Sequence, residues 1–166
     1  MPPASWTERN GWKLYAHPAF SQRLEALVRT VEALRRQQPE SYRGHPKTKL
    51  LKRTLDLILV EIPRDPNAAE FQLGNTLGPA HRHWRRAKFL GRFRLFFRFS
   101  SMHKAIVYAW VNDETTLRKA GARSDPYAAF SRQLREGNPP DGWEDLLHEA
   151  GAAASRLDSD LERSLQ

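Results

Sequence analysis

The apolar residues near the N-terminus recur at helical spacing in two segments. The first stripe consists of Leu24, Leu27, Val28, Val31 and Leu34. Charged residues fill many of the positions between them, which is the pattern of a helix with one buried face. Pro18 follows His17 and suits the first turn of a helix, because the N–H that proline lacks has no partner there. We therefore predict an amphipathic helix that begins at Pro18 and ends near Gln38.

A second apolar stripe consists of Leu50, Leu51, Leu55, Ile58, Leu59 and Ile62. It predicts a second helix over about residues 47–62, which Pro63 would end. The connection that follows, residues 64–80, is rich in proline and glycine and is long for a compact domain. Connections of this length often carry functional residues.

After this connection, the apolar positions alternate or form a short unbroken run, as they do in strands. We predict strands at about residues 84–89, 93–99 and 104–112. The last of them contains the run AIVYAWV, which suits a strand that is buried on both faces.

Capping residues predict short helices after the strands. Asp113 suits the N-cap of a helix over residues 114–120. Ser124 or Asp125 can cap the next helix, with Pro126 in its first turn.

A last helix is expected after Asp141, and residues 151–166 are either helical or frayed. The chain is long enough for one domain, residues 1–166, with its core over about 10–147. The predicted class is α+β: two N-terminal helices packed on a small, twisted, largely antiparallel sheet, with further helices at the C-terminus.

The turn between the first two predicted strands decides which side chains share a face. A two-residue turn would place the charges of Arg86 and Lys88 on the apolar core face without partners, which is costly. A loop of residues 90–92, with Gly91 or a neighbour at positive φ, avoids this and places Lys88 opposite Arg94. One face is then apolar, and the other, the basic face, carries Trp84, Arg86, Lys88, Arg94, Phe96 and Arg98.

The charge of the chain indicates a polyanionic partner. The chain has 27 Lys and Arg against 19 Asp and Glu, a net charge of +8, and residues 71–112 contain no acid. Arginine forks suit phosphate and aromatic rings suit unpaired bases, so the basic face is typical of single-strand nucleic-acid binding. The alternative is a solvated face without a ligand, but like charges across a hairpin repel and need a compensating role.

Composition also excludes several classes of site. The chain has no cysteine, which excludes disulfides, thiol nucleophiles and cysteine-ligated metals. No secretory signal or membrane-spanning apolar run is recognisable. We expect a cytoplasmic protein with no membrane partner, no metal and no cofactor.

Several motifs together resemble one known family. They are NGWKLYAHPAF (10–20), LGNTLG (73–78), WRRAKF (84–89), GRFRLFFRFS (91–100), WVNDETTLRKAG (110–121), and then SDPYAAFSRQL and NPPDGW. In this order they resemble the YhaV family of toxins from about Asn10 to Leu147.

This resemblance implies a RelE-like fold and an endoribonuclease that cleaves mRNA, with or without the ribosome, and thereby inhibits translation and growth. It also implies a type II toxin–antitoxin pair, whose antitoxin is PrlF-like with an AbrB-type DNA-binding domain. Operator DNA would be bound only through the toxin–antitoxin complex.

The resemblance further implies residue roles. The catalytic cations of RelE-like enzymes fall on Arg86, Lys88 and Arg94. Such enzymes often place another arginine and a tyrosine after the last strand, where this chain reads NDETTLRKAG. The candidate acids and bases are therefore Asp113, Glu114, Arg118 and Tyr127.

Metal-free RNA cleavage needs a base for the 2′-hydroxyl, cations for the phosphorane and an acid for the leaving 5′-oxygen. Arg94, with Arg92 or Arg98, suits the charge-stabilising role, whereas Arg86 suits a phosphate clamp because arginine keeps its proton. Lys88 is placed where neighbouring cations and partial burial would favour a neutral, basic amine.

The remaining candidates have simpler alternative roles. Asp113 can cap a helix, and Glu114 can complement the helix dipole. His81 and His83 could shuttle protons or hold a metal, but without an obvious third ligand we expect loop histidines near phosphate. The expected RNA contacts are Trp84, Arg92, Phe96, Arg98, His81 and His83.

Two other functions stay open at this point. A non-catalytic module that binds single-stranded RNA would use the same basic face. That face could also dock an acidic segment of the antitoxin, which is compatible with a nuclease.

Overall fold

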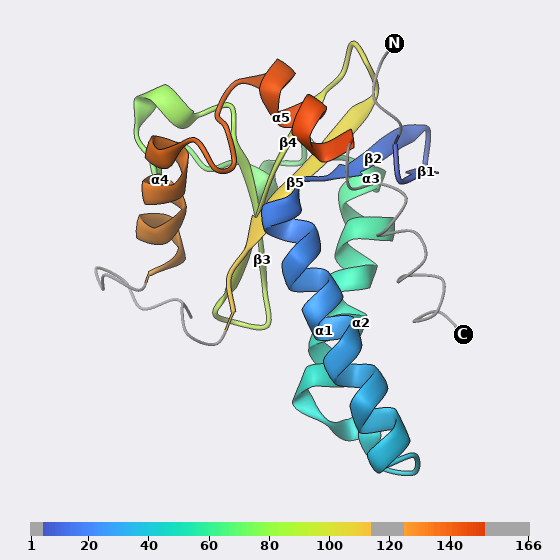
Figure 1. Ribbon diagram of the computed structural model, residues 1–166. Coiled ribbons are helices and arrows are strands. Elements are labelled where there is room, and N and C mark those ends of the chain that lie inside the picture. Colours follow the sequence, from blue (N-terminus) through green and yellow to red (C-terminus); the bar gives the residue numbers. More distant parts are fainter. Residues whose placement is uncertain (1–4, 114–124, 152–166) are drawn as a thin grey trace.

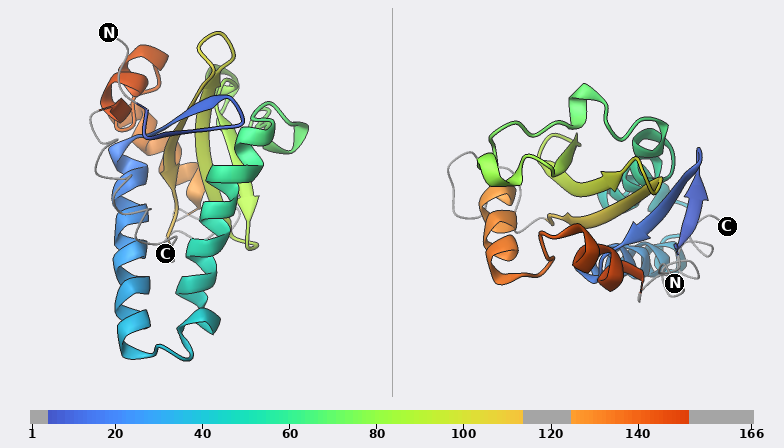
Figure 2. Two further views of the ribbon diagram at one scale, coloured as in Figure 1. Left: turned by 90° about the vertical axis from the view of Figure 1, so that its right-hand side faces the viewer. Right: turned by 90° about the horizontal axis from the view of Figure 1, so that it is seen from above.

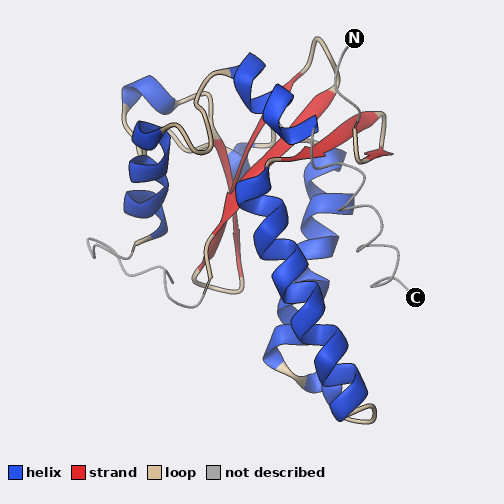
Figure 3. Ribbon diagram, viewed as in Figure 1, coloured by secondary structure: helices blue, strands red, loops and turns tan. Residues whose placement is uncertain are grey.

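The computed structural model describes residues 5–113 and 125–151 (Figure 1). One sheet in the order β1-β2-β5-β4-β3 contains β1 (Thr7–Arg9), β2 (Trp12–Ala16), β3 (Arg85–Phe89), β4 (Phe93–Ser100) and β5 (Ala105–Val111). β2 pairs with β5 in parallel, and the other neighbours are antiparallel. Figure 3 shows the twist of this sheet. The predicted α+β class is confirmed.

The hairpin of β1 and β2 is absent from the elements that the sequence predicted. Its strands have three and five residues, too few for an alternating pattern to be recognised. Asn10 and Gly11, both at positive φ, form the turn. β2 extends the sheet beyond β5, so that β5 becomes its central strand.

The two N-terminal helices lie close to their predicted ranges. They are α1 (Pro18–Gln37) and α2 (Pro46–Asp56), the latter continued by a π-helical turn (Leu57–Glu61) and α3 (Ile62–Arg64). Pro63, which was predicted to end the helix after Ile62, lies within its last turn, one residue before the helix ends at Arg64. α1 and α2 form a long pair that extends beyond the sheet (Figures 1 and 2).

Short 3-10 turns occupy the connections. One, Tyr42–Gly44, joins α1 to α2, and two more, Ala69–Phe71 and Pro79–His81, lie in the connection to β3. No helix in the described part of the chain is long and apolar enough to cross a membrane.

The sheet has a separate apolar core on each face. Buried residues of α1 and α2 pack with Leu95, Phe97 and Tyr108 in the first core. The phenol of Tyr108 donates a 2.5 Å hydrogen bond to the carbonyl of Ile58, which ties the helical segment to the sheet.

The second core lies under α4 (Pro126–Glu136) and α5 (Trp143–Gly151). Here Trp84, Phe96, Trp110 and Phe130 are buried together. In both views of Figure 2, α5 and the α2 segment lie on opposite sides of the sheet. The predicted helix over residues 114–120 and the segment from residue 152 lie outside the described residues.

The basic face is therefore not open, contrary to the sequence-based prediction. Phe130 stacks on Phe96 with 4.3 Å between ring centroids and meets Trp84 edge-on at 5.0 Å. The caps predicted a helix at α4, but its docking position on β3 and β4 was not foreseen. Burial of these aromatic rings stabilises that docking.

Candidate functional site

The β3–β4 hairpin has the predicted three-residue loop. Lys88 pairs with Arg94 and Phe89 with Phe93, so this register is confirmed. Leu90 (φ 46°) and Gly91 (φ 77°) both adopt left-handed conformations in the loop. The register brings Arg86, Lys88, Arg94 and Arg98 to one face of the sheet, whereas Arg85 lies opposite Phe97 on the other face.

Two of these charged side chains converge on a tyrosine of α4. Arg86 Nη1 and Arg94 Nε both donate to the hydroxyl of Tyr127, at 3.3 and 3.2 Å. All three residues are buried, with exposed fractions of 9%, 7% and 7%. We call this group the arginine–tyrosine cluster.

Backbone carbonyls hold the two guanidinium groups in place. Arg86 Nη2 donates to the carbonyls of Glu70 and Gln72, at 3.4 and 3.2 Å. Arg94 Nη1 donates to those of Gly91 and Phe93, at 2.9 and 2.8 Å. The long connection before β3 thus supplies part of the cluster, as a functional loop would.

Asn112, directly after β5, fixes the loop end of the β3–β4 hairpin. Its Oδ1 accepts from the backbone N–H of Arg94 at 2.7 Å, and its Nδ2 donates to the carbonyl of Arg92 at 3.1 Å. Sequence reasoning missed this residue, because a buried amide at a strand end has no local signature.

Within the described part of the chain, the positive charge of the cluster has no acidic counterpart. No carboxylate of residues 5–113 and 125–151 forms an ion pair with Arg86 or Arg94. The Nε of Arg86 is also buried without a hydrogen-bond partner in these ranges. Burial of cations against neutral acceptors alone is costly, which favours the approach of an anion.

A polar hollow opens beside the cluster at the edge strand β3. It has a volume of about 420 Å³ and is lined by Arg53, Leu57, Glu61, Ala69, Glu70, Phe71, Arg86 and Lys88. Arg53 and Glu61 form an ion pair across part of its wall. Lys88 is exposed, so the partial burial expected for its amine was wrong.

A second cluster of polar side chains lies farther along the same face of the sheet. His81 Nδ1 and His83 Nε2 each lie 2.9 Å from Oδ1 of Asp141, and Trp84 Nε1 donates to the same oxygen at 2.8 Å. We call His81, His83 and Asp141 the histidine–aspartate cluster. Asp141 supplies the third candidate ligand that the sequence did not show beside His81 and His83. It lies too far from them in the sequence for a spacing rule to reveal it.

The environment shifts the pKa values in this second cluster. Burial alone would raise the pKa of Asp141, but hydrogen bonds from Trp84, His83 and His81 hold it below its ordinary value. Burial, and then the charge of Arg98, lower the pKa of His83 against the opposing effect of Asp141. Asp141 is therefore the stable anion of this group.

Arg98 stabilises the loop that carries Asp141. Its Nη1 donates to the carbonyl of Asp141 at 2.7 Å, and its guanidinium lies 5.8 Å from the ring of Trp84 and 5.7 Å from that of Trp143. Burial lowers the pKa of Arg98, although Asp141 opposes the shift. These contacts make Arg98 a structural residue of the α4–α5 connection.

The two clusters are separated by apolar side chains. Arg94 and Arg98 are four residues apart on β4, or about 13 Å at the usual rise of a strand. Phe96 lies between them and is covered by Phe130. The basic face is therefore divided into two polar sites and does not form one continuous surface.

Several predicted positions need correction. Trp84 and Phe96 are both 0% exposed, so neither ring is available to stack on a base in this conformation. Arg92 is exposed in the hairpin loop, as an RNA contact requires. Asp113 pairs with Arg23 of α1 at 2.8 Å, away from the arginine–tyrosine cluster. Glu114 and Arg118 lie outside the described residues.

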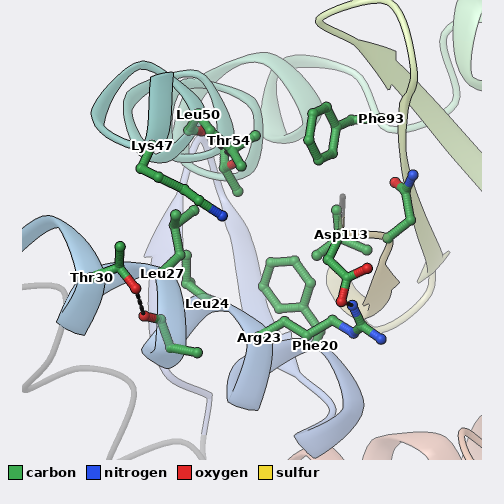
Figure 4. Close-up of a pocket in the computed structure, with 13 residues that line it drawn as sticks. Phe20, Arg23, Leu24, Leu27, Thr30, Lys47, Leu50, Thr54, Phe93 and Asp113 are labelled. Carbon is green, nitrogen blue, oxygen red and sulfur yellow. Dashed lines mark hydrogen bonds and ion pairs between the residues drawn. The ribbon is translucent and has the colours of Figure 1, made fainter. Parts of the chain in front are cut away.

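An apolar pocket between α1 and α2 is a poor candidate for the reaction centre. Figure 4 shows Leu24, Leu27 and Phe93 in its wall and the Arg23–Asp113 ion pair at its rim. The pocket measures about 230 Å³. Among the described residues that line it, Arg23 is neutralised by Asp113, whereas Arg86 and Arg94 converge on Tyr127 without an acidic partner in the described ranges.

The chain is similar to known toxins over most of its length. Residues 14–151 match the family described as a toxin with endonuclease activity, of a toxin–antitoxin system. Toxin YhaV of Escherichia coli O6:H1 is 45% identical over 142 residues, which is 84% of this chain and 92% of the relative.

The ribonuclease toxin YhaV of Escherichia coli K12 is 44% identical over the same shares of the two chains. No solved structure shows significant similarity to the chain. The shared motifs, the matched length and the identity to these relatives lead to one conclusion: the chain belongs to the YhaV family of toxins with endonuclease activity from toxin–antitoxin systems.

Proposed function

We propose that this toxin is a metal-independent endoribonuclease with a RelE-like arrangement, and that the arginine–tyrosine cluster is its catalytic centre. The observation that carries this proposal is the convergence of two buried guanidinium groups on one phenol oxygen, without an acid partner among the described residues. The naming of a relative as a ribonuclease toxin supports RNA as the substrate.

The arginines supply charge stabilisation in this proposal. The donors of Arg86 and Arg94 that hold Tyr127 can hold non-bridging phosphate oxygens in the same way, and guanidinium bonds to phosphate are strong. Because these donors are positioned before the substrate binds, they stabilise the phosphorane with little reorganisation. Lys88 contacts the phosphate backbone from the exposed side of the hollow.

Tyr127 is the proton-transfer group. Among the described residues that contact both guanidinium groups, it is the side chain that can exchange a proton. The 2′-oxygen of the RNA attacks the adjacent phosphorus as its proton passes to the oxygen of Tyr127. The phenol proton of Tyr127 passes to the 5′-oxygen as the bond between phosphorus and that oxygen breaks, so that a 2′,3′-cyclic phosphate and a 5′-hydroxyl result and Tyr127 is neutral again. Asp113 is disfavoured as the base because it pairs with Arg23.

The partners follow from the same proposal. A toxin of a toxin–antitoxin system has an antitoxin partner. We propose that this partner is PrlF-like with an AbrB-type DNA-binding domain, and that the toxin acts on cytoplasmic mRNA and reaches operator DNA only through the complex.

Growth after induction tests this function. The wild-type toxin should arrest growth, and Tyr127→Phe should relieve the arrest because it removes the proton-transfer group and keeps the ring. Tyr42→Phe, in the turn between α1 and α2, is the matched control and should remain toxic. Equal toxicity of the two variants at equal soluble levels would refute the role of Tyr127, and an inert wild-type protein would favour the non-catalytic binding module.

A further inference from the structure

The histidine–aspartate cluster takes no part in the proposed cleavage, and its donor set is that of a metal centre. His81, His83 and Asp141 each offer one ligand atom, and these atoms all lie within 4.8 Å of one another. Two imidazoles and a carboxylate, with a fourth position left to water, form a common ligand set for zinc. We propose that this cluster binds a zinc ion.

The spacing of the ligand atoms requires little adjustment. Atoms that bind a tetrahedral zinc at about 2.0–2.1 Å lie about 3.3 Å from one another. His81 Nδ1 and His83 Nε2 now lie 2.9 Å from Asp141 Oδ1. Those two distances would widen by about 0.4 Å to admit the ion. The two imidazole nitrogens, which lie within 4.8 Å of each other, would adopt a similar separation, with both unprotonated.

The groups around the ligands already orient them. The fully buried Trp84 donates Nε1 to Asp141 Oδ1 at 2.8 Å, and Arg98 fixes the backbone carbonyl of Asp141 at 2.7 Å. Hydrogen bonds of this kind set the orientation of ligands in metal sites. The charge of Arg98 lowers the affinity for a cation, so the site should bind zinc more weakly than one without a neighbouring guanidinium.

The ion would fasten two segments that are distant in the sequence. His81 and His83 precede β3, whereas Asp141 lies in the connection between α4 and α5. Because the stack of Phe96 and Phe130 separates this site from Arg94, the ion would stabilise the packing of α4 and α5 and would not enter the cleavage step.

Metal titration of the purified full-length toxin, stripped of metal, tests this proposal. Calorimetry with Zn²⁺ should show about one ion per chain, and Co²⁺ should give the intense visible absorption of a tetrahedral site. His83→Gln and Asp141→Asn should each weaken binding by about tenfold or more. His103→Gln, which alters an exposed turn histidine, should leave binding unchanged.

Thermal unfolding supplies a second readout. Zn²⁺ should raise the unfolding midpoint of the wild-type protein and of His103→Gln, but not that of the two ligand variants. Asp141→Asn also disturbs the loop that carries this residue. His81→Gln removes a ligand but keeps the hydrogen bond between Trp84 and Asp141, so it tests the loss of a ligand alone. Absence of Zn²⁺ binding, or equal affinity in the wild type, His81→Gln and His83→Gln, would overturn the proposal.

Discussion

At the scale of single residues, arginine geometry explains why the cluster cannot be built from lysine. Arg94 donates Nη1 to two carbonyls and Nε to Tyr127 at the same time. A lysine amine is a single point and cannot reach these directions together. The sequence revealed the positions of Arg86 and Arg94 through the hairpin register, but not their burial, which depends on the docking of α4.

The first prediction concerns Arg94→Lys. Loss of charge-assisted bonds at a buried site should lower the free energy of unfolding by about 2–3 kcal/mol and RNA cleavage by about 100-fold. Arg92→Lys, at an exposed position of the adjacent loop, should change stability by less than about 0.5 kcal/mol. Denaturant unfolding and a cleavage assay measure both effects, and similar behaviour of the two variants would contradict the assigned role of Arg94.

A second residue-scale feature is the pair of His-Pro sequences that open α1 and α2. Nδ1 of His17 accepts from the N–H of Ala19 at 3.0 Å, and Nδ1 of His45 accepts from that of Lys47 at 3.1 Å. Each histidine is therefore the N-cap of its helix. The sequence predicted the helix start at Pro18 but not the use of histidine as the capping acceptor.

This cap leads to a pH-dependence prediction for His17. Burial lowers the pKa of His17 below its ordinary value of 6.5, against the opposing effect of Glu149. The folded state then binds fewer protons than the unfolded state, so the stabilisation is present above about pH 6.5 and is lost as the pH falls through the unfolded and then the folded pKa.

His17→Asn should reduce the dependence of the free energy of unfolding on pH, because asparagine can cap the helix but does not titrate in this range. The free energy of unfolding between about pH 5 and 7.5 is the measurement. His103→Asn controls for the loss of one titrating histidine. An unchanged slope in His17→Asn would show that this cap does not contribute to the pH dependence.

At the scale of elements, the sequence predicted helices and strands whose apolar pattern repeats within one segment. It did not predict the contacts between segments. The stripes of α1 and α2 and the alternation in β3 and β4 predicted these elements close to their bounds. The parallel pairing of β2 with β5 and the position of α4 depend on tertiary contacts that no local pattern contains. For the same reason, Tyr127 was only a distant candidate and Asp141 was missed.

The hairpin loop gives an element-scale prediction. Gly91 has φ of 77°, where a side chain is strained even though a Cβ added there would meet nothing within 4 Å. Gly91→Ala should therefore lower the free energy of unfolding by about 1 kcal/mol or more. A Cβ added at Gly44 would also meet nothing within 4 Å, and the backbone of Gly44 lies outside the left-handed region. Gly44→Ala should therefore be neutral or slightly stabilising. Equal unfolding midpoints in denaturant would contradict the importance of the loop geometry.

At the scale of the whole molecule, the net positive charge and the hollow at the edge strand β3 favour the approach of RNA at this edge. The chain carries a net charge of +8, and Lys88 lies at the exposed rim of the hollow that reaches Arg86. Positive charge at this edge favours association with a polyanion and makes it dependent on salt.

The corresponding prediction concerns Lys88→Gln. If Lys88 makes one phosphate contact, this change should reduce the slope of log affinity against log salt by about 0.7 for single-stranded RNA. Lys13→Gln, on the distant strand β2, should leave the slope unchanged. Binding is measured with a cleavage-deficient Tyr127→Phe background, and equal slopes for both lysine variants would place the RNA elsewhere.

The most direct test of the central claim is RNA cleavage by purified, antitoxin-free toxin in EDTA, with analysis of the new ends. With the wild type and Tyr42→Phe, first on free RNA and then with translating ribosomes, we expect 2′,3′-cyclic phosphate and 5′-hydroxyl ends. With Tyr127→Phe, which should remain folded, we expect a reaction about 100-fold slower. Cleavage that requires added metal, or that proceeds equally fast in Tyr127→Phe, would contradict a metal-independent reaction at the arginine–tyrosine cluster.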